Sequence, residues 1–183
     1  MSKNYEMLSK ISREDWVNIS QKINPTRLKS EDILGVPVFE INEIFVPVCE
    51  RILSGAGLKD NLGNEYEYPY IIGVTGSVAV GKTTFAKVLK EILGNPPYNF
   101  ATEVVSTDNF LFSNEILNET QSLHRKGFPE SFNYPEIINF LQIVKNYTSV
   151  EMPVYSHQTY DITDQTQTIP PTQILIIEGI NIL

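Results

Sequence analysis

The chain has 183 residues, of which 42% are hydrophobic and 20% are charged. This balance is typical of a globular protein that buries a core, and the length suits one domain with a small extension. A formal net charge of −8 argues against nucleic acid or an anionic membrane surface as a partner. The single cysteine excludes an internal disulfide. The N-terminal residues lack the apolar segment of a secretion signal, and no apolar run approaches membrane-spanning length, so we expect a cytoplasmic protein.

Residues 1–69 are expected to form a helical N-terminal extension. Ser12 and Asp15 form a variant of the capping box, which predicts that a helix begins there. The stretch 54–68 is rich in glycine, asparagine and charged residues, as is typical of a loop. We therefore expect a separate main domain over residues 70–183.

A second helix of this extension is expected over residues 41–53, where apolar side chains recur at helical spacing. Pro47 lies inside this pattern and should kink the helix or remove one of its hydrogen bonds. Cys49 lies among the apolar positions, which indicates a buried structural thiol rather than a reactive one.

The main domain opens with its most informative stretch. An apolar run at 71–74 leads into GSVAVGKT, a full match to the pattern G-x-x-x-x-G-K-[ST], and a helical pattern follows as far as residue 93. A surface turn is the ordinary alternative for two glycines, but the strand before the motif and the helix after it favour a phosphate-binding loop. The residues expected to bind a nucleotide are Gly76, Ser77, Val78, Ala79, Val80, Gly81, Lys82, Thr83 and Thr84.

The chemistry of this loop explains its residue types. Gly76 and Gly81 allow the backbone to turn sharply, so that successive N–H groups point inward at a polyphosphate. The helix that starts near Lys82 adds the positive end of its dipole. Lys82 can reach the β- and γ-phosphates, and the Thr83 hydroxyl can ligate Mg²⁺.

Two acidic residues follow predicted strands. Asp108 ends a strand expected over 103–107, and a carboxylate at the carboxyl end of a strand faces the crevice where open α/β sheets bind ligands. An ordinary turn aspartate is the alternative on position alone. Glu178 follows the apolar run 174–177, which resembles a Walker B strand whose carboxylate lies near the metal.

The region between these strands contains weaker signals. Residues 113–123 suggest a short helix, and the positive run 124–127 is either a solvated loop or a phosphate contact. Asn133 is a good N-cap for a further helix with apolar residues at core spacing. Residues 152–162 form a β-rich stretch that contains His157, which is by itself more typical of a structural histidine than of a functional one.

Taken together, the motifs resemble those of type I (bacterial-type) pantothenate kinase, in the P-loop kinase superfamily that also contains uridine kinases and phosphoribulokinase. The phosphate loop alone indicates only an NTPase, whereas KGFPES and PVYSH at this spacing are far more specific. The segments that carry the resemblance are PYIIGVTGSVAVGKTT at 69–84, STDNFL at 106–111, KGFPESF at 126–132, PVYSHQTYDI at 153–162 and ILIIEGINIL at 174–183.

The resemblance implies an α/β fold of the three-layer P-loop NTPase type, with a parallel sheet and a helical N-terminal extension. It also implies ATP-dependent phosphorylation of pantothenate to 4′-phosphopantothenate, the first step of coenzyme A biosynthesis, with ATP and Mg²⁺ as cofactors. The residues that match the family's functional positions are Asp108 and Lys82 (catalytic), Tyr155 and His157 (pantothenate pocket), and Thr83 and Glu178 (metal).

The sequence also departs from the family pattern. Family members continue well beyond Leu183, so we expect an incomplete sheet that leaves the apolar strand 71–74 with an unpaired edge. Either a homo-oligomer that covers this edge or poor solubility should follow. Asn109 stands where glycine is common, and Asn133 stands where aspartate is common. The loop 35–40 lacks the usual Gly-x-Asn-Glu. Two alternative functions therefore stay open: a related kinase of another small alcohol, such as a nucleoside, and a truncated, non-catalytic nucleotide-binding remnant.

Overall fold

The computed structural model describes residues 12–15, 18, 33–55 and 69–182. The chain forms two compact units, Met1–Lys59 and Asp60–Leu183. The domain boundary expected between residues 69 and 70 stays a prediction, because residues 56–68 lie outside the described part of the chain. None of the helices in the described ranges is long and apolar enough to cross a membrane.

The described part of the first unit is mainly helical. Helix α2 (Val38–Glu40) continues through a π-helical segment (Ile41–Phe45) into helix α3 (Val46–Gly55). The expected helix over 41–53 is therefore confirmed, and the wider π turn immediately precedes Pro47. Proline lacks an N–H and its ring clashes with the carbonyl four residues earlier, so a local widening of the helix accommodates it.

Two smaller predictions for this unit are also confirmed. The Ser12 hydroxyl accepts a hydrogen bond from the Asp15 N–H at 3.0 Å and donates one to Asp15 Oδ2 at 2.7 Å, which makes the predicted capping-box variant. Most of the helix that follows lies outside the described residues. Cys49 is fully buried, and burial raises the pKa of its thiol, as expected of a structural cysteine.

The second unit is built on a three-stranded parallel sheet in the order β1-β5-β2. Its strands are β1 (Tyr70–Thr75), β5 (Ile174–Gly179) and β2 (Thr102–Ser106). Each strand agrees with a predicted one to within two residues at the start and end. Because the strands run parallel, their carboxyl ends meet at one edge of the sheet, where Glu178 lies opposite Val74 on one side and Ser106 on the other.

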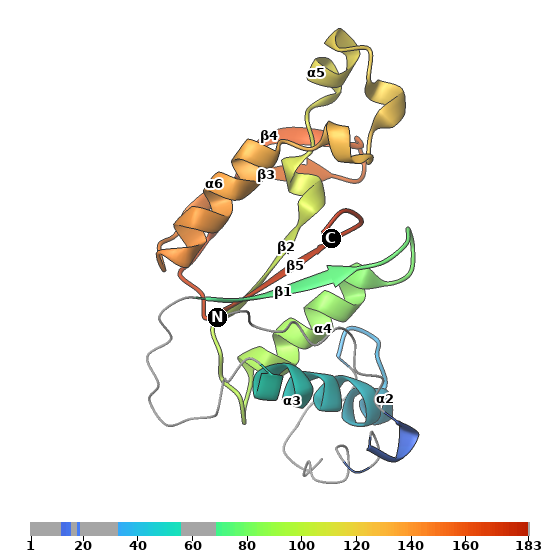
Figure 1. Ribbon diagram of the computed structural model, residues 1–183, viewed down its shortest axis with the longest axis vertical. Helices are drawn as coiled ribbons and strands as arrows, with labels where there is room; N and C mark the ends of the chain where they lie inside the picture. The colour runs from blue at the N-terminus through green and yellow to red at the C-terminus, as the bar shows by residue number, and fades with distance from the viewer. Residues whose placement is uncertain (1–11, 16–17, 19–32, 56–68, 183) are drawn as a thin grey trace, which may run out of the picture. The chain divides into compact units, whose positions relative to one another are not determined.

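Helices cover both faces of this sheet, which gives the expected three-layer α/β fold (Figure 1). Helix α4 (Lys82–Gly94) contacts all three strands from one side. Helix α6 (Tyr134–Lys145), capped by Asn133 as predicted, packs with a β-hairpin on the other side. The core of this second side consists of Val105, Phe110, Phe140, Val144, Val150, Met152, Ile169 and Leu175.

The hairpin consists of antiparallel strands β3 (Val150–Ser156) and β4 (Asp161–Ile169), with a shift of register between Pro153 and Tyr155. It forms a sheet of its own rather than an extension of the parallel sheet. The sequence indicated only one β-rich stretch over 152–162, so most of β4 was missed. The side chains from Asp164 to Thr168 are exposed and polar, and they carry no hydrophobic alternation.

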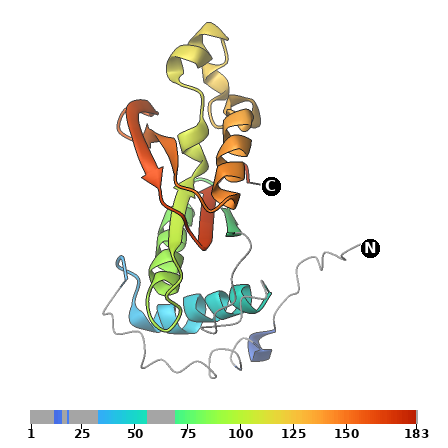
Figure 2. The same ribbon diagram turned by 90° about the vertical axis from the view of Figure 1, so that its left-hand side faces the viewer.

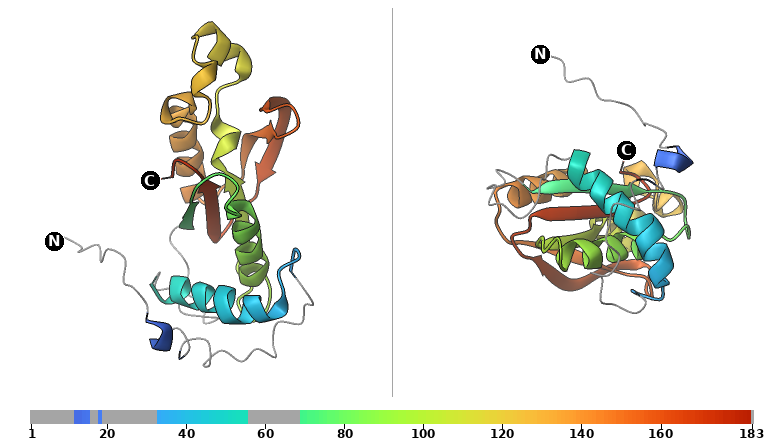
Figure 3. Two further views of the ribbon diagram at one scale, coloured as in Figure 1. Left: turned by 90° about the vertical axis from the view of Figure 1, so that its right-hand side faces the viewer. Right: turned by 90° about the horizontal axis from the view of Figure 1, so that it is seen from below.

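A long connection links β2 to α6. It begins with a 3₁₀ turn, η3 (Thr107–Phe110), which passes between α6 and the β3–β4 hairpin (Figure 2). The remainder, at the far end of this unit in Figure 3, contains helix α5 and the 3₁₀ turns η4 and η5. Helix α5 begins after the Ser113 cap as expected but ends earlier than predicted. The bounds are Asn114–Glu119 (α5), Leu123–Arg125 (η4) and Pro129–Ser131 (η5).

Candidate functional site

The glycine-bounded loop between β1 and α4 has an open, tightly turned backbone. Gly81 has φ +92° and serves as N-cap of α4, and Ala79 has φ +60°, a conformation that costs energy for a residue with a Cβ. Gly81 has no side chain with which to cap the first turn of α4, and no described side chain accepts a hydrogen bond from the N–H groups of this turn. The loop therefore offers unpaired donors and the positive end of a helix dipole, as an anion site requires.

Two side chains of the loop, those of Val80 and Lys82, pack against its own backbone. A Cβ on Gly76 would lie 3.0 Å from Val80 Cγ1, closer than ordinary packing, so a side chain there would have to displace Val80. The Lys82 ammonium group folds back and donates to the Ser77 carbonyl at 2.8 Å. This bond holds a positive charge over the mouth of the loop.

Thr83 and Glu178 meet at the carboxyl edge of the sheet. The Thr83 hydroxyl, in the first turn of α4, donates to Glu178 Oε1 at 3.2 Å. Glu178 is 5% exposed and lies on the central strand β5, between the two flanking strands. The structure therefore brings together the two residues expected to hold a metal.

Asp108 lies on η3, directly after β2. The Ser106 hydroxyl accepts the Asp108 N–H at 3.4 Å and so caps this short turn. Burial raises the pKa of the Asp108 carboxyl, and the negative charge of Glu178 raises it further, against the opposing effect of His157 and Lys82. The carboxylate thus lies within electrostatic range of the glutamate, the loop lysine and the hairpin histidine.

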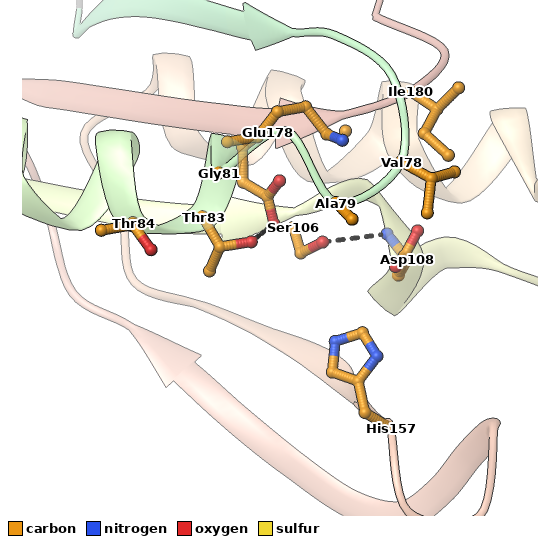
Figure 4. A pocket seen from close by; sticks show the side chains of 12 residues that line it. Val78, Ala79, Gly81, Thr83, Thr84, Ser106, Asp108, His157, Glu178 and Ile180 are labelled. Carbon is orange, nitrogen blue, oxygen red and sulfur yellow. Dashed lines mark hydrogen bonds between the residues drawn. The ribbon is translucent and has the colours of Figure 1, made fainter.

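One pocket of about 370 Å³ connects these groups. Figure 4 shows Thr83 and Glu178 near its floor, with Asp108 beside them and His157 facing them from the hairpin. The phosphate loop is therefore neither collapsed nor filled by side chains, and Asp108 faces the same space. The residues that line the pocket are Val78, Ala79, Gly81, Lys82, Thr83, Thr84, Ser106, Asp108, His157, Glu178, Gly179 and Ile180.

Some expected residues lie outside this lining. Gly76, Ser77 and Val80 belong to the loop but do not line the pocket. Tyr155 lies beside His157 rather than in the lining, with the two rings edge to face at 5.2 Å between centroids. Burial and the charge of Asp108 raise the pKa of the Tyr155 phenol, so this ring still lies close to the aspartate.

Sequence reasoning missed three lining residues. Ser106, Gly179 and Ile180 each lie within two positions of Asp108 or Glu178, at or just after the carboxyl end of β2 or β5. The rule that ligands bind outside the carboxyl ends of parallel strands applies to all of them. It could have identified them had it been extended to the neighbouring positions.

The positive run 124–127 is largely engaged in contacts within the unit. Arg125 pairs with Glu130 at 2.5 Å and stacks on the Phe128 ring. The Lys126 ammonium group donates to Asn114 Oδ1 and to the Tyr160 carbonyl, each at 2.6 Å. Lys126 also lowers the pKa of Asp108, although less than the histidine and the loop lysine do, so its charge reaches the pocket.

The parallel sheet, the loop with its free N–H groups and the acidic residue on the central strand define a P-loop fold of the nucleoside triphosphate-binding class. The model of the phosphoribulokinase/uridine kinase family matches residues 71–183. The chain therefore belongs to that family.

Individual relatives in sequence resemble the chain over a longer stretch than the family model does. The chain is 37% identical to a pantothenate kinase from Streptococcus gordonii and 36% identical to one from Streptococcus equi subsp. zooepidemicus, in each case over the whole chain. It spans 65% of the length of each relative. Among solved structures, a D-glycerate 3-kinase from Cryptococcus neoformans is similar with a TM-score of 0.54 and 18% identity, over 72% of this chain and 49% of that one. This last similarity concerns the fold alone.

Proposed function

We propose that the protein phosphorylates pantothenate with ATP to give 4′-phosphopantothenate, the first step of coenzyme A biosynthesis. The observation that carries the proposal is the single pocket in which a phosphate-binding loop faces a half-buried aspartate. Phosphoryl transfer asks mainly for positioning and for neutralisation of charge, and this pocket supplies groups for both. The named relatives, pantothenate kinases over the whole length of this chain, support pantothenate as the acceptor.

The phosphate loop is the proposed donor side. The N–H groups of the first turn of α4 and the Lys82 ammonium group bind the β- and γ-phosphates of ATP. Thr83 and Glu178 are suited to Mg²⁺, since one hydroxyl and one carboxylate, completed by phosphate oxygens and water, form a common set for this ion. When bound, the ion neutralises charge on the phosphates.

Asp108 is the proposed general base. Its carboxylate accepts the proton of the attacking hydroxyl, and it faces the phosphate loop across the pocket. Burial and the negative charge of Glu178 raise its pKa, which increases its affinity for a proton. The carboxylate is thereby a better base than an exposed aspartate.

We propose that strand β3 and the residue that follows it, His157, form the side of the pocket that binds the acceptor alcohol. His157 lines the pocket opposite Asp108, and Tyr155 supports the histidine ring from the side. The two residues provide polar groups on the side of the pocket away from the phosphate loop. A cytoplasmic location and a homo-oligomeric state belong to the same proposal and stay predictions.

A coupled assay of ADP release tests the proposal. We expect release that depends on pantothenate and falls at least about 100-fold in Asp108→Ala, as for the loss of a general base. Asp164→Asn, which changes an exposed carboxylate on β4, is the matched control and should keep the parent rate. Turnover with uridine instead of pantothenate would favour the alternative acceptor. ATP binding without turnover on either alcohol would favour the non-catalytic alternative.

A further inference from the structure

Asn109 adjoins Asp108 on the turn η3, but its side chain serves a different partner. Asn109 Oδ1 accepts the backbone N–H of Tyr155 at 2.9 Å, a bond between residues 46 positions apart. Tyr155 lies on β3, two residues before His157, which faces Asp108 across the pocket. One amide side chain therefore connects the turn that carries Asp108 to the strand that carries the opposite wall.

The hairpin needs such a connection. A two-stranded sheet is marginally stable by itself, so the position of β3 and β4 comes from what they pack against. At the base of the hairpin, Val150, Met152 and Ile169 are buried in the core beside α6. Apolar packing fixes this end.

Toward the turn of the hairpin, apolar burial ends. Residues 157–160 are all exposed, so polar contacts must hold this end. Asn114 and Lys126 bind its turn through the Asp161 carboxylate and the Tyr160 carbonyl. Both of these contacts lead to the far end of the β2–α6 connection. The Asn109 contact leads directly to the turn that bears Asp108.

We propose that Asn109 is a positioning residue, whose side-chain amide fixes the distance between Asp108 and the wall formed by Tyr155 and His157. An acceptor alcohol held at that wall then presents its hydroxyl to the carboxylate. This inference rests on the proposed function. Glycine, common here in the family that the sequence resembles, has no side chain to make this bond. A misplacement of about 1 Å between reacting groups can lower a rate about 100-fold, so one such contact is significant.

Three variants of the full chain test the role of Asn109. Asn109→Ala removes the acceptor oxygen, and Asn109→Asp keeps an acceptor at the same position. Thr163→Ala is the matched control, because it removes a hydrogen bond of the same hairpin, from the Thr163 hydroxyl to the Val154 carbonyl at 3.0 Å, away from the pocket. Each variant is measured for amide hydrogen exchange at Tyr155, for ATP affinity and for kcat and KM with pantothenate.

We expect the Tyr155 amide to exchange at least about tenfold faster in Asn109→Ala, because its hydrogen bond is lost. Asn109→Asp and Thr163→Ala should retain the protection of this amide. We also expect kcat to fall at least about tenfold in Asn109→Ala, with ATP affinity unchanged. Unchanged exchange at Tyr155, or a loss of kcat no larger than in Thr163→Ala, would overturn the proposal.

The two proposals fail in different ways. If the parent chain shows no turnover with pantothenate, the proposed function is wrong. In that case kcat cannot be used to test the role of Asn109. The exchange rate and the NMR shifts of the His157 ring then decide the role of Asn109. Shifts that move in Asn109→Ala but not in Thr163→Ala support positioning of the wall, and His157 shifts that stay in place overturn it.

Discussion

The Thr83 hydroxyl donates to Glu178 Oε1 at 3.2 Å, although the two residues are 95 positions apart in the sequence. Strands β1 and β5, together with helix α4, bring these two residues together. Helix α4 starts directly after the loop that follows β1, and β5 pairs with β1 in register, so Glu178 ends beside the first turn of α4. A hydroxyl and a carboxylate held this close are the two protein ligands that we propose for Mg²⁺.

This pair predicts that Mg²⁺ strengthens ATP binding through Glu178. In Glu178→Gln we expect the gain in ATP affinity on adding Mg²⁺ to fall about tenfold, because the neutral amide loses its attraction for the ion. Calorimetric titration with ATP, with and without Mg²⁺, measures this gain. Glu103→Gln, at a half-buried glutamate on β2 that pairs with Lys90, is the control and should keep the full gain.

Lys82 is predicted to bind the triphosphate of ATP. Lys82→Ala should weaken ATP affinity about 10- to 100-fold, the range for the loss of a hydrogen bond to a charged group. Lys87→Ala, an exposed lysine one turn further along α4, should bind ATP as the parent does. Fluorescence titration with a labelled ATP analogue compares the two variants. Equal affinities would mean that the Lys82 ammonium group remains on the Ser77 carbonyl when nucleotide binds.

Asp108 is predicted to destabilise the fold at neutral pH. Burial and Glu178 raise its pKa in the folded protein, so ionisation costs stability at pH values above that raised pKa. Asp108→Asn should therefore raise the thermal unfolding midpoint near pH 7. The difference should vanish as the pH falls below about 4, where the carboxyl is protonated in both states. A midpoint that is lowered at neutral pH would contradict this assignment.

Gly179 is predicted to tolerate no side chain. A Cβ there would lie 2.9 Å from Thr107 Cβ and 3.0 Å from Thr107 Cγ2, and closer still to its hydroxyl. Gly179→Ala should therefore cost about 1–3 kcal/mol of unfolding free energy, as overpacking does, and displace η3. Gly94→Ala, where the new methyl meets only the Phe100 carbonyl at 3.9 Å, is the control and should be close to neutral. Urea denaturation measures both.

Self-association is predicted from the outer strand of the parallel sheet. β1 has β5 as its one neighbour among the described strands, and no described strand pairs with its other edge. We expect sedimentation velocity to show a species larger than a monomer, with a population that rises with concentration. A single monomeric species at every concentration would contradict the prediction.

The sequence was sufficient to predict that the phosphate loop, Asp108 and Glu178 lie together at one edge of the sheet. The phosphate loop is contiguous, and its residue types follow from the chemistry of holding phosphate on backbone N–H groups. Asp108 and Glu178 were found by a different rule, because each directly follows an apolar strand and the carboxyl ends of parallel strands share one edge. Neither step required knowledge of side-chain packing.

The acceptor side was less accessible to sequence reasoning. Most of β4 has exposed threonines and glutamines without apolar alternation, so no pattern marks it as a strand. The bond from Asn109 to Tyr155 joins two segments whose approach depends on how the hairpin packs against η3. Such a contact leaves no local signal in either segment. The position of Tyr155 behind His157 has the same origin.

The separate sheet of the hairpin has a consequence for substitutions made in it. In the described residues β3 and β4 form a sheet of their own, and no ladder of backbone hydrogen bonds joins them to the parallel sheet. We therefore expect substitutions confined to the exposed face of β4 to leave the backbone of the phosphate loop unchanged.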